Sequence, residues 1–373
     1  MFSMVRNIKR GQLIYTFEIK ILKMGRWSEE KINNWYKQQP YLVGCNFIPS
    51  TAINQLEMWQ AATFDPETIN KELSWAAKIG MNTIRVFLHD LLWLQDAEGF
   101  KQRIHQFLEI ANSHGIKTMF VLFDDCWFSD AKLDKQPEPI PGIHNSGWLQ
   151  SPGKAAATDS TQEQRLKSYV QDIVGTFAND ERVLLWDVYN ELGNFFLPIL
   201  IQPWYKKYPK LLIQGIKHLF LTIPTMSLFV NSVKWIREIN PSQPITAGLW
   251  FGNRTLTKAL VESSDIISFH HYGKVNSLKQ QIKGLKAYRR PILCTEFLAR
   301  NLGSTFQTHL PVFKEEMVGC YNWGLVSGKT QTIFTWEGTV GDTEPAVWYH
   351  DIFRKDGTPY SKEEIDVFNQ LKG

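Results

Sequence analysis

The chain has 373 residues, which is enough to bury a large core. It carries 41 Lys and Arg against 37 Asp and Glu, a formal net charge of +4, so charge does not indicate a nucleic-acid partner. Four scattered cysteines form no CxxC pair, which argues against a zinc site or a disulfide framework, and no run of about 18 apolar residues predicts a membrane span.

The first 26 residues form a basic leader that we expect to be poorly ordered. Charged residues at positions 18, 20 and 23 interrupt its apolar residues, so it lacks the uninterrupted core of a signal peptide. We therefore expect a cytoplasmic location if this start is correct, and the sequence otherwise leaves the location unknown.

Eight short apolar segments bounded by turn-forming residues predict β-strands. They are residues 41–47, 82–88, 116–123, 183–191, 244–250, 266–272, 291–296 and 319–326. Helices are expected at 27–39, 65–80, 98–114, 159–177, 227–239, 278–288 and 311–317, and from Ser361 onward. Strands and helices alternate through residues 27–373 without a change of composition, which predicts one α/β domain, a (β/α)8 TIM barrel.

Two segments exceed what such a barrel needs. The Pro/Gly-rich loop 135–153 is long, and loops of that length are usually functional or disordered. An apolar and basic insertion occupies residues 195–229, after strand four. We favour a small helical flap for it, with a lid, a subsite wall or a homo-oligomer contact as alternatives. Its four prolines argue against one continuous amphipathic helix on a membrane.

Two of the expected strands end in a glutamate, Glu191 after strand four and Glu296 at the end of strand seven. Active-site residues of a barrel lie at the carboxyl ends of its parallel strands, so both side chains are expected in one pocket. A carboxylate pair about 5 to 5.5 Å apart can act as the nucleophile and the acid/base of a retaining glycosidase. Asp187 lies four residues earlier, roughly 13 Å deeper in the barrel, and is expected to be structural.

These residues resemble clan A of the glycoside hydrolases, most closely family 5, over about residues 41–326. The matching positions are Arg85, Asn190-Glu191, His270-His271-Tyr272 and Glu296. The resemblance implies a retaining double displacement on a β-linked glucan, mannan, xylan or derived oligosaccharide, without a metal or another cofactor. In this scheme Glu191 is the acid/base and Glu296 is the nucleophile.

The resemblance also assigns roles to neighbouring residues. Asn190 is expected to hold the 2-hydroxyl of the sugar, and His270 matches the histidine of the family's His-x-Tyr element. Arg85 is expected to keep Glu296 ionised, with a low pKa, and Tyr272 to orient the same carboxylate. The pKa of the acid/base is expected to be raised by burial and by the second carboxylate.

Other positions depart from the family pattern. Family 5 enzymes commonly carry a histidine after strand three, where this chain has Asp124-Asp125-Cys126-Trp127. Asp124 and Asp125 fit either the binding of sugar hydroxyls or the capping of a loop. Trp323 fits either a pocket floor or the core, and Trp127, Trp250 and Trp336 are further candidates for stacking on a sugar ring.

Two other functions use the same residues. A non-catalytic sugar-binding barrel is disfavoured because both glutamates and their supporting residues are present. A metal-dependent barrel hydrolase would use His89, His270, His271 and the aspartates. The His-x-His pair that amidohydrolases carry on the first strand is missing here.

Overall fold

The computed structural model describes residues 23, 25–195, 199, 207, 209–211, 223–251 and 253–371. Most of the expected leader, residues 1–26, and most of the insertion, residues 195–229, lie outside the described residues. The roles expected for these two segments, including a homo-oligomer contact, stay predictions.

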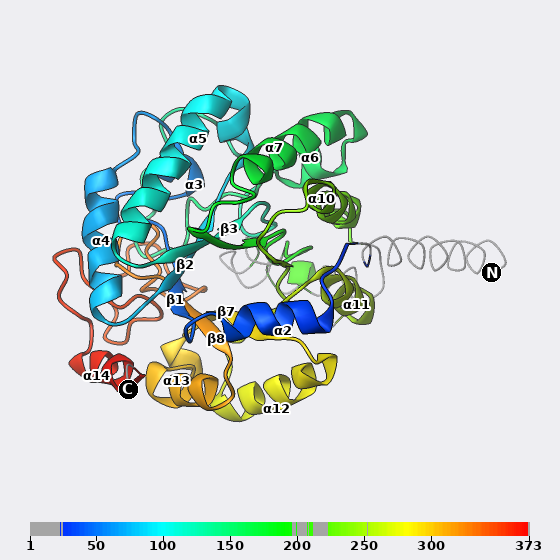
Figure 1. Ribbon diagram of the computed structural model, residues 1–373. Helices are drawn as coiled ribbons and strands as arrows, with labels where there is room; N and C mark the ends of the chain where they lie inside the picture. Colours follow the sequence, from blue (N-terminus) through cyan, green and yellow to red (C-terminus); the bar gives the residue numbers. More distant parts are fainter. Residues whose placement is uncertain are drawn as a thin grey trace.

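Eight parallel strands form the central sheet (Figure 1). They are β1 (Val43–Asn46), β2 (Thr83–Phe87), β3 (Lys117–Val121), β4 (Val183–Asp187), β5 (Ile245–Thr246), β6 (Ile267–His270), β7 (Ile292–Phe297) and β8 (Gly319–Trp323). Their order is β5-β4-β3-β2-β1-β8-β7-β6, and a parallel bridge between Leu249 and Phe269 joins the two ends of the sheet. The expected (β/α)8 barrel is confirmed.

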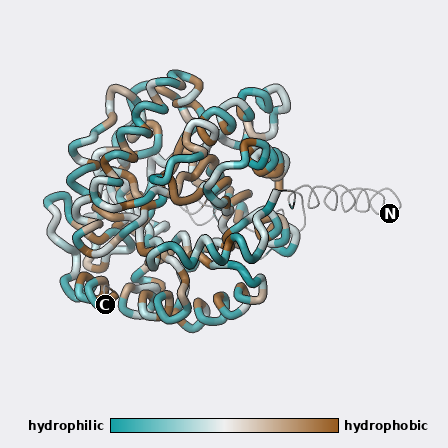
Figure 2. The backbone as a smooth tube through the Cα atoms, in the orientation of Figure 1, coloured by the Kyte–Doolittle hydropathy of each residue, from teal (hydrophilic) through white to brown (hydrophobic). Residues whose placement is uncertain are grey.

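Helices surround this barrel and cover its apolar strands (Figure 2). They are α2 (Glu29–Lys37), α3 (Gln55–Trp59), α4 (Pro66–Lys78), α5 (Asp90–Ser113), α6 (Lys154–Thr158), α7 (Glu163–Thr176), α10 (Met226–Ile239), α11 (Arg254–Ser263), α12 (Val275–Leu285), α13 (Phe306–Glu315) and α14 (Lys362–Leu371). Helix α4 begins as expected, because the Asp65 side chain accepts a hydrogen bond from the Thr68 amide. Among the described helices, none combines the length and apolarity that crossing a bilayer requires.

The structure corrects three details of the predicted elements. Strand β4 ends at Asp187, whereas the apolar run predicted a strand through Glu191. Helix α13 begins at Phe306 and contains Pro311, whereas the prediction used Pro311 as the first residue of the helix. Helices α3, α6 and α11 were not predicted.

The segment around α2 closes the amino-terminal end of the barrel. Trp27 and Ile32 pack against residues at or near the starts of six strands, which are Leu42, Met119, Leu184, Ile266, Leu293 and Tyr321. The Trp27 amide donates a hydrogen bond of 2.8 Å to Asp265 Oδ1, and Arg237 donates two of 2.8 Å to the same carboxylate. Active sites of such barrels lie at the opposite end, at the carboxyl ends of the strands.

Candidate active site

Glu191 and Glu296 meet at the carboxyl end of the barrel. One carboxylate oxygen of each and one ring nitrogen of His270 lie within 4.8 Å of one another. This spacing is close to the carboxylate separation of retaining glycosidases, about 5 to 5.5 Å, and far below the separation in which a water molecule fits between two inverting carboxylates. Glu191 follows β4 and Glu296 lies in β7, and because these two strands are not adjacent, the curvature of the barrel brings the two residues together.

Glu191 lies in a turn beyond the end of β4 and has a left-handed backbone, with φ of 43°. Glutamate seldom adopts this conformation, so the surrounding contacts have to hold it there. Asn194 donates a hydrogen bond to Oε2, and the Cys126 thiol donates another at 3.2 Å. The Nδ1 atom of His270 lies 2.7 Å from Oε1. These three contacts fix both oxygens of the carboxylate.

Glu296 is held by a cation and a phenol. Arg85 Nη1 donates to Oε1 at 2.9 Å, and the Tyr272 hydroxyl donates to Oε2 at 2.8 Å. Arg85 is fully buried and also pairs with Asp187, through its Nε at 2.9 Å. Asp187 therefore has the structural position that the sequence indicated, as the second counter-ion of the same guanidinium.

Arg85 also orients Asn190, the residue expected to bind the 2-hydroxyl. Its Nη2 donates to Asn190 Oδ1 at 2.7 Å, and Asn190 Nδ2 donates to Asp124 Oδ1 at 3.0 Å. Because both ends of the amide are used, the oxygen and nitrogen positions are set by the protein. One arginine thus positions an amide and a carboxylate at the same pocket.

The two glutamates face a cavity of about 320 Å³. Its described lining consists of Cys126, Trp127, His144, Asn145, Trp148, Asn190, Glu191, Asn194, Trp250, Phe251, His270, Tyr272, Glu296, Trp323 and Trp336. All four of the tryptophans proposed for stacking on sugar line it. A cavity of aromatic walls with a few converging polar groups is typical of a small-ligand site, and flat aromatic faces suit sugar rings.

Several lining residues were not singled out from the sequence as site residues. Asn194 has a signal in the chain, since it follows Glu191 by three residues and can turn back onto that carboxylate. His144, Asn145 and Trp148 belong to the long loop 135–153, which was expected to be functional, although nothing in it marked individual residues. Phe251 follows Trp250 and had no comparable signal.

A model of one protein family matches residues 48–348, described as cellulase, glycosyl hydrolase family 5. This match covers most of the chain. The chain belongs to glycosyl hydrolase family 5. Comparison with curated proteins gave no match.

Several solved structures show the same fold. Exo-beta-1,4-mannosidase Op5Man5 from Opitutaceae bacterium strain TAV5 is 17% identical, with a TM-score of 0.54, over 88% of this chain and 58% of that chain. The endo-1,4-beta-D-mannanase from Thermotoga petrophila RKU-1 is 13% identical, with a TM-score of 0.51, over 89% and 99%. GH5_18 from Streptomyces cattleya is 10% identical, with a TM-score of 0.53, over 89% and 80%. The chain thus spans little more than half the length of the first of these.

Burial controls the ionisation of the two glutamates of this family 5 enzyme. It raises the pKa of Glu296 to about 7, although Arg85 and Tyr272 act in the opposite direction. The low pKa expected for Glu296 is therefore wrong for the substrate-free pocket, because desolvation outweighs the favourable charge of Arg85. Burial also raises the pKa of Glu191, as expected, and lowers that of His270 to about 4, so this histidine is neutral at pH 7.

These directions predict the pH dependence of catalysis. With Glu296 as the expected nucleophile and Glu191 as the expected acid/base, kcat/KM should fall below about pH 7 as Glu296 takes up a proton. The raised pKa of Glu191 should move the limb on which this group ionises to a higher pH than for an exposed glutamate, and the two limbs belong to the coupled pair. A profile of kcat/KM against pH tests this. An acidic limb below pH 5 would show that Arg85 lowers the pKa of Glu296 more than burial raises it.

Asp124 and Asp125 lie behind the pocket, outside its described lining. Asp124 accepts hydrogen bonds from Trp148 Nε1 at 2.8 Å and from Asn190. Asp125 accepts from the Tyr189 hydroxyl at 2.9 Å and from the Gly193 amide at 2.7 Å. Of the two roles considered from the sequence, the structure places both aspartates as supports of the loops that carry pocket residues.

The histidines of the metal-hydrolase alternative do not converge. The His89 side chain accepts a hydrogen bond of 3.2 Å from the Leu91 amide at the start of α5. His271 Nδ1 lies 2.8 Å from Gln281 Oε1. Among the described residues, the group with metal-ligand spacing is Glu191, His270 and Glu296. Arg85 already supplies a positive charge 2.9 Å from Glu296, which disfavours a second cation there.

Proposed function

We propose that this family 5 enzyme is a retaining β-glycosidase that acts on β-1,4-linked mannosides. The observation that carries the mechanism is the pair of carboxylates within 4.8 Å, one bound by Arg85 and Tyr272 and the other by Asn194 and Cys126. Two of the structural neighbours are named as a β-1,4-mannosidase and a β-1,4-mannanase, which supports the choice of sugar.

The first step forms a glycosyl ester on Glu296. A Glu296 oxygen attacks the anomeric carbon while the bond from that carbon to the leaving oxygen breaks, and Glu191 gives its proton to that oxygen. Asn190 holds the 2-hydroxyl, whose hydrogen bond strengthens as the ring flattens. Formation of the ester removes the negative charge of Glu296, which lowers the pKa of Glu191 and readies it to act as a base.

The second step returns the enzyme to its starting state. A water molecule gives a proton to Glu191 and attacks the anomeric carbon, and the bond to Glu296 breaks with release of its carboxylate. The contacts of Arg85 and Tyr272 with Glu296 stabilise the negative charge that returns. Two inversions at one carbon give net retention.

The test is turnover of 4-nitrophenyl β-mannoside beside the matching glucoside, xyloside and galactoside. We expect the mannoside to have the highest kcat/KM, the β-anomer to appear first by ¹H NMR, and activity to persist after treatment with a chelator. An α-anomer appearing first would refute retention, and activity that a chelator abolishes and zinc restores would establish the metal-dependent alternative. Binding of mannosides without turnover would support the non-catalytic barrel.

A further inference from the structure

Asn145 is a buried amide whose side-chain atoms lack protein partners. It is 1% exposed, and within the described chain neither Oδ1 nor Nδ2 has a hydrogen-bond partner. Its φ of 49° lies in the left-handed region, which asparagine tolerates better than most residues. Buried polar groups are rarely left unpaired, so this amide is suited to bind a ligand.

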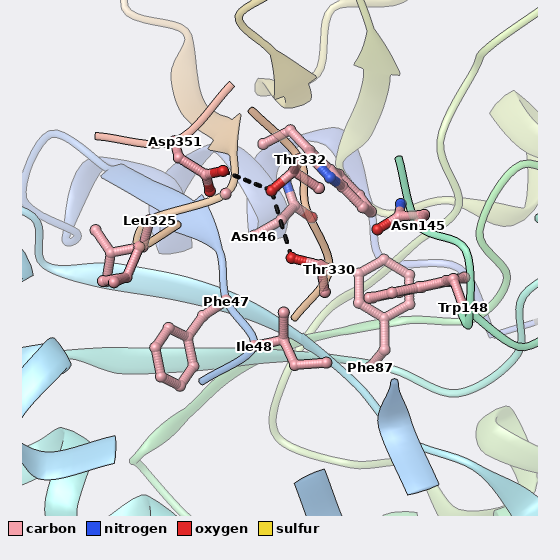
Figure 3. A pocket seen from close by; sticks show the side chains of 13 residues that line it. Asn46, Phe47, Ile48, Phe87, Asn145, Trp148, Leu325, Thr330, Thr332 and Asp351 are labelled. Atoms are coloured by element: carbon pink, nitrogen blue, oxygen red, sulfur yellow. Dashed lines mark hydrogen bonds between the residues drawn. The ribbon is translucent and has the colours of Figure 1, made fainter. Parts of the chain in front are cut away.

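The position of Asn145 identifies the space that it can reach. It belongs to the lining of the catalytic cavity and also to that of a second cavity of about 10 Å³ (Figure 3). Trp148 and Trp323 line both cavities as well. The smaller cavity has room for one water molecule at most, so it offers few partners for an amide with three or four hydrogen-bonding positions.

Loops after β3 and β8 are joined beside Asn145. The hydrogen bonds between them run from Asn145 N to Thr330 O at 2.8 Å, Gln331 Nε2 to Ile140 O at 2.6 Å, Gly142 N to Gln331 Oε1 at 3.1 Å and Gly341 N to Pro141 O at 2.8 Å, and His144 Nδ1 lies 2.8 Å from Phe334 O. A Cβ on Gly142 would lie 2.2 Å from the Thr339 carbonyl oxygen, so the loops are in close contact. We call the two segments that these contacts join, residues 140–145 and 330–341, the joined wall.

The loop after β1 extends this wall. Asn54 Nδ2 donates to the Gly147 carbonyl at 2.9 Å, and Lys329 N donates to the Ser50 carbonyl at 3.1 Å. The loop after β1 is therefore hydrogen-bonded to both loops of the joined wall, the one after β3 and the one after β8. A sugar chain that entered past Asn145 would have to separate these hydrogen bonds.

The catalytic residues indicate which part of the substrate faces the wall. Glu191 protonates the leaving oxygen, so the leaving group lies on the side of Glu191, near Trp250 and the partly exposed Phe251. Trp323 ends β8, which pairs with the β7 strand that carries Glu296, and both Trp323 and Asn145 line the catalytic cavity. We therefore infer that the sugar that becomes attached to Glu296 lies toward these two residues and that the joined wall stands at the non-reducing end of the substrate.

We propose that Asn145 binds hydroxyls of the terminal, non-reducing sugar and that the joined wall ends the pocket behind it. The enzyme then removes sugars one at a time from the chain end and does not cleave inside the chain. This inference rests on the proposed function, because it uses Glu191 as the acid/base to orient the substrate. It adds an exo mode of action and a residue that recognises the terminal sugar.

The first experiment follows the products released from β-1,4-mannohexaose at early times. We expect mannose and the pentasaccharide as the only first products, and resistance of a hexaose whose terminal 4-hydroxyl carries a bulky group. Early release of di-, tri- and tetrasaccharides would refute the inference. Hydrolysis of 4-nitrophenyl β-mannoside serves as the control, because its absence would contradict the proposed function itself.

The second experiment tests Asn145 with 3-, 4- and 6-deoxy aryl β-mannosides. In the wild type we expect at least one deoxy compound to lose about tenfold in kcat/KM, the effect of one buried hydrogen bond. In Asn145→Gly that loss should largely disappear. Glycine accepts the left-handed backbone, so the fold is not strained by the change.

Asn240→Gly is the matched control, since Asn240 also has a left-handed backbone, with φ of 54°, and ends α10 away from the pocket. This variant should keep the wild-type response to every deoxy compound. If the deoxy compounds lose the same factor in kcat/KM with Asn145→Gly as with the wild type, the amide pairs only with buried water and the inference is wrong. Thermal unfolding of both variants separates binding from stability.

Discussion

Replacement of Glu296 by glutamine should lower kcat for an aryl β-mannoside by about 10⁴-fold or more, the scale on which loss of a catalytic nucleophile acts. Glutamine keeps the size of the side chain and can still meet Arg85 and Tyr272, so the fold should be retained. The reason for the loss is chemical, because an amide oxygen forms no stable ester with the anomeric carbon. Steady-state kinetics with a 4-nitrophenyl leaving group measures it.

A comparison with Glu191→Ala separates the roles of the two carboxylates. Loss of a general acid typically removes about 10²- to 10⁴-fold of rate, and a 2,4-dinitrophenyl leaving group needs little protonation, so this variant should still form the ester. Added azide should then give a β-glycosyl azide with Glu191→Ala and an α-glycosyl azide with a small-residue Glu296 variant. The opposite pattern would reverse the assignments. Glu109→Gln on the exposed face of α5 is a neutral control.

Replacement of Arg85 by lysine should lower both the stability and the activity of the enzyme. The guanidinium donates hydrogen bonds of 2.7 to 2.9 Å to Asn46, Asp187, Asn190 and Glu296. A lysine ammonium cannot contact all four partners at once. Carboxylates that lose a partner while buried destabilise a fold by about 3 to 5 kcal/mol. Unfolding in denaturant measures the change.

The pH profile distinguishes a role of Arg85 at the site from a purely structural one. Weaker contact with the cation should raise the pKa of Glu296 further, so the acidic limb of kcat/KM should move to higher pH in Arg85→Lys. An unchanged limb would show that Arg85 does not act on the nucleophile. Arg354→Lys, in the exposed pair with Glu344, should change stability by less than about 1 kcal/mol and leave the limb in place.

The barrel could be predicted because its strands are short apolar runs that turn-forming residues separate. The ends of these strands were less certain. The run from Val183 to Val188 continues into Tyr189, which is fully buried, so hydrophobicity did not reveal that regular pairing ends at Asp187. The turn at Glu191 is held by contacts with Asn194 and Cys126. The pattern of hydrophobic residues along the chain does not reveal such contacts.

The meeting of the two glutamates was predictable for a different reason from the pocket walls. Glu191 follows β4 and Glu296 lies near the end of β7, so the parallel topology of the barrel brings both to one rim. Asn145 and Trp148 belong to a loop whose path depends on hydrogen bonds with Thr330 and Asp124, which are distant in the chain. The raised pKa of Glu296 also depends on burial from all sides, which a charge pattern does not report.

The cover that α2 forms over the amino-terminal end of the barrel has a consequence for synthesis of the protein. Trp27 bonds to a carboxylate 238 residues later, and β1 pairs with β8. The hydrogen bond of Trp27 can form only after Asp265 has left the ribosome, and the pairing of β1 only after β8 has, so β1 stays without its β8 partner until the end of the barrel is made. The barrel therefore closes only when the last strand of the chain is available.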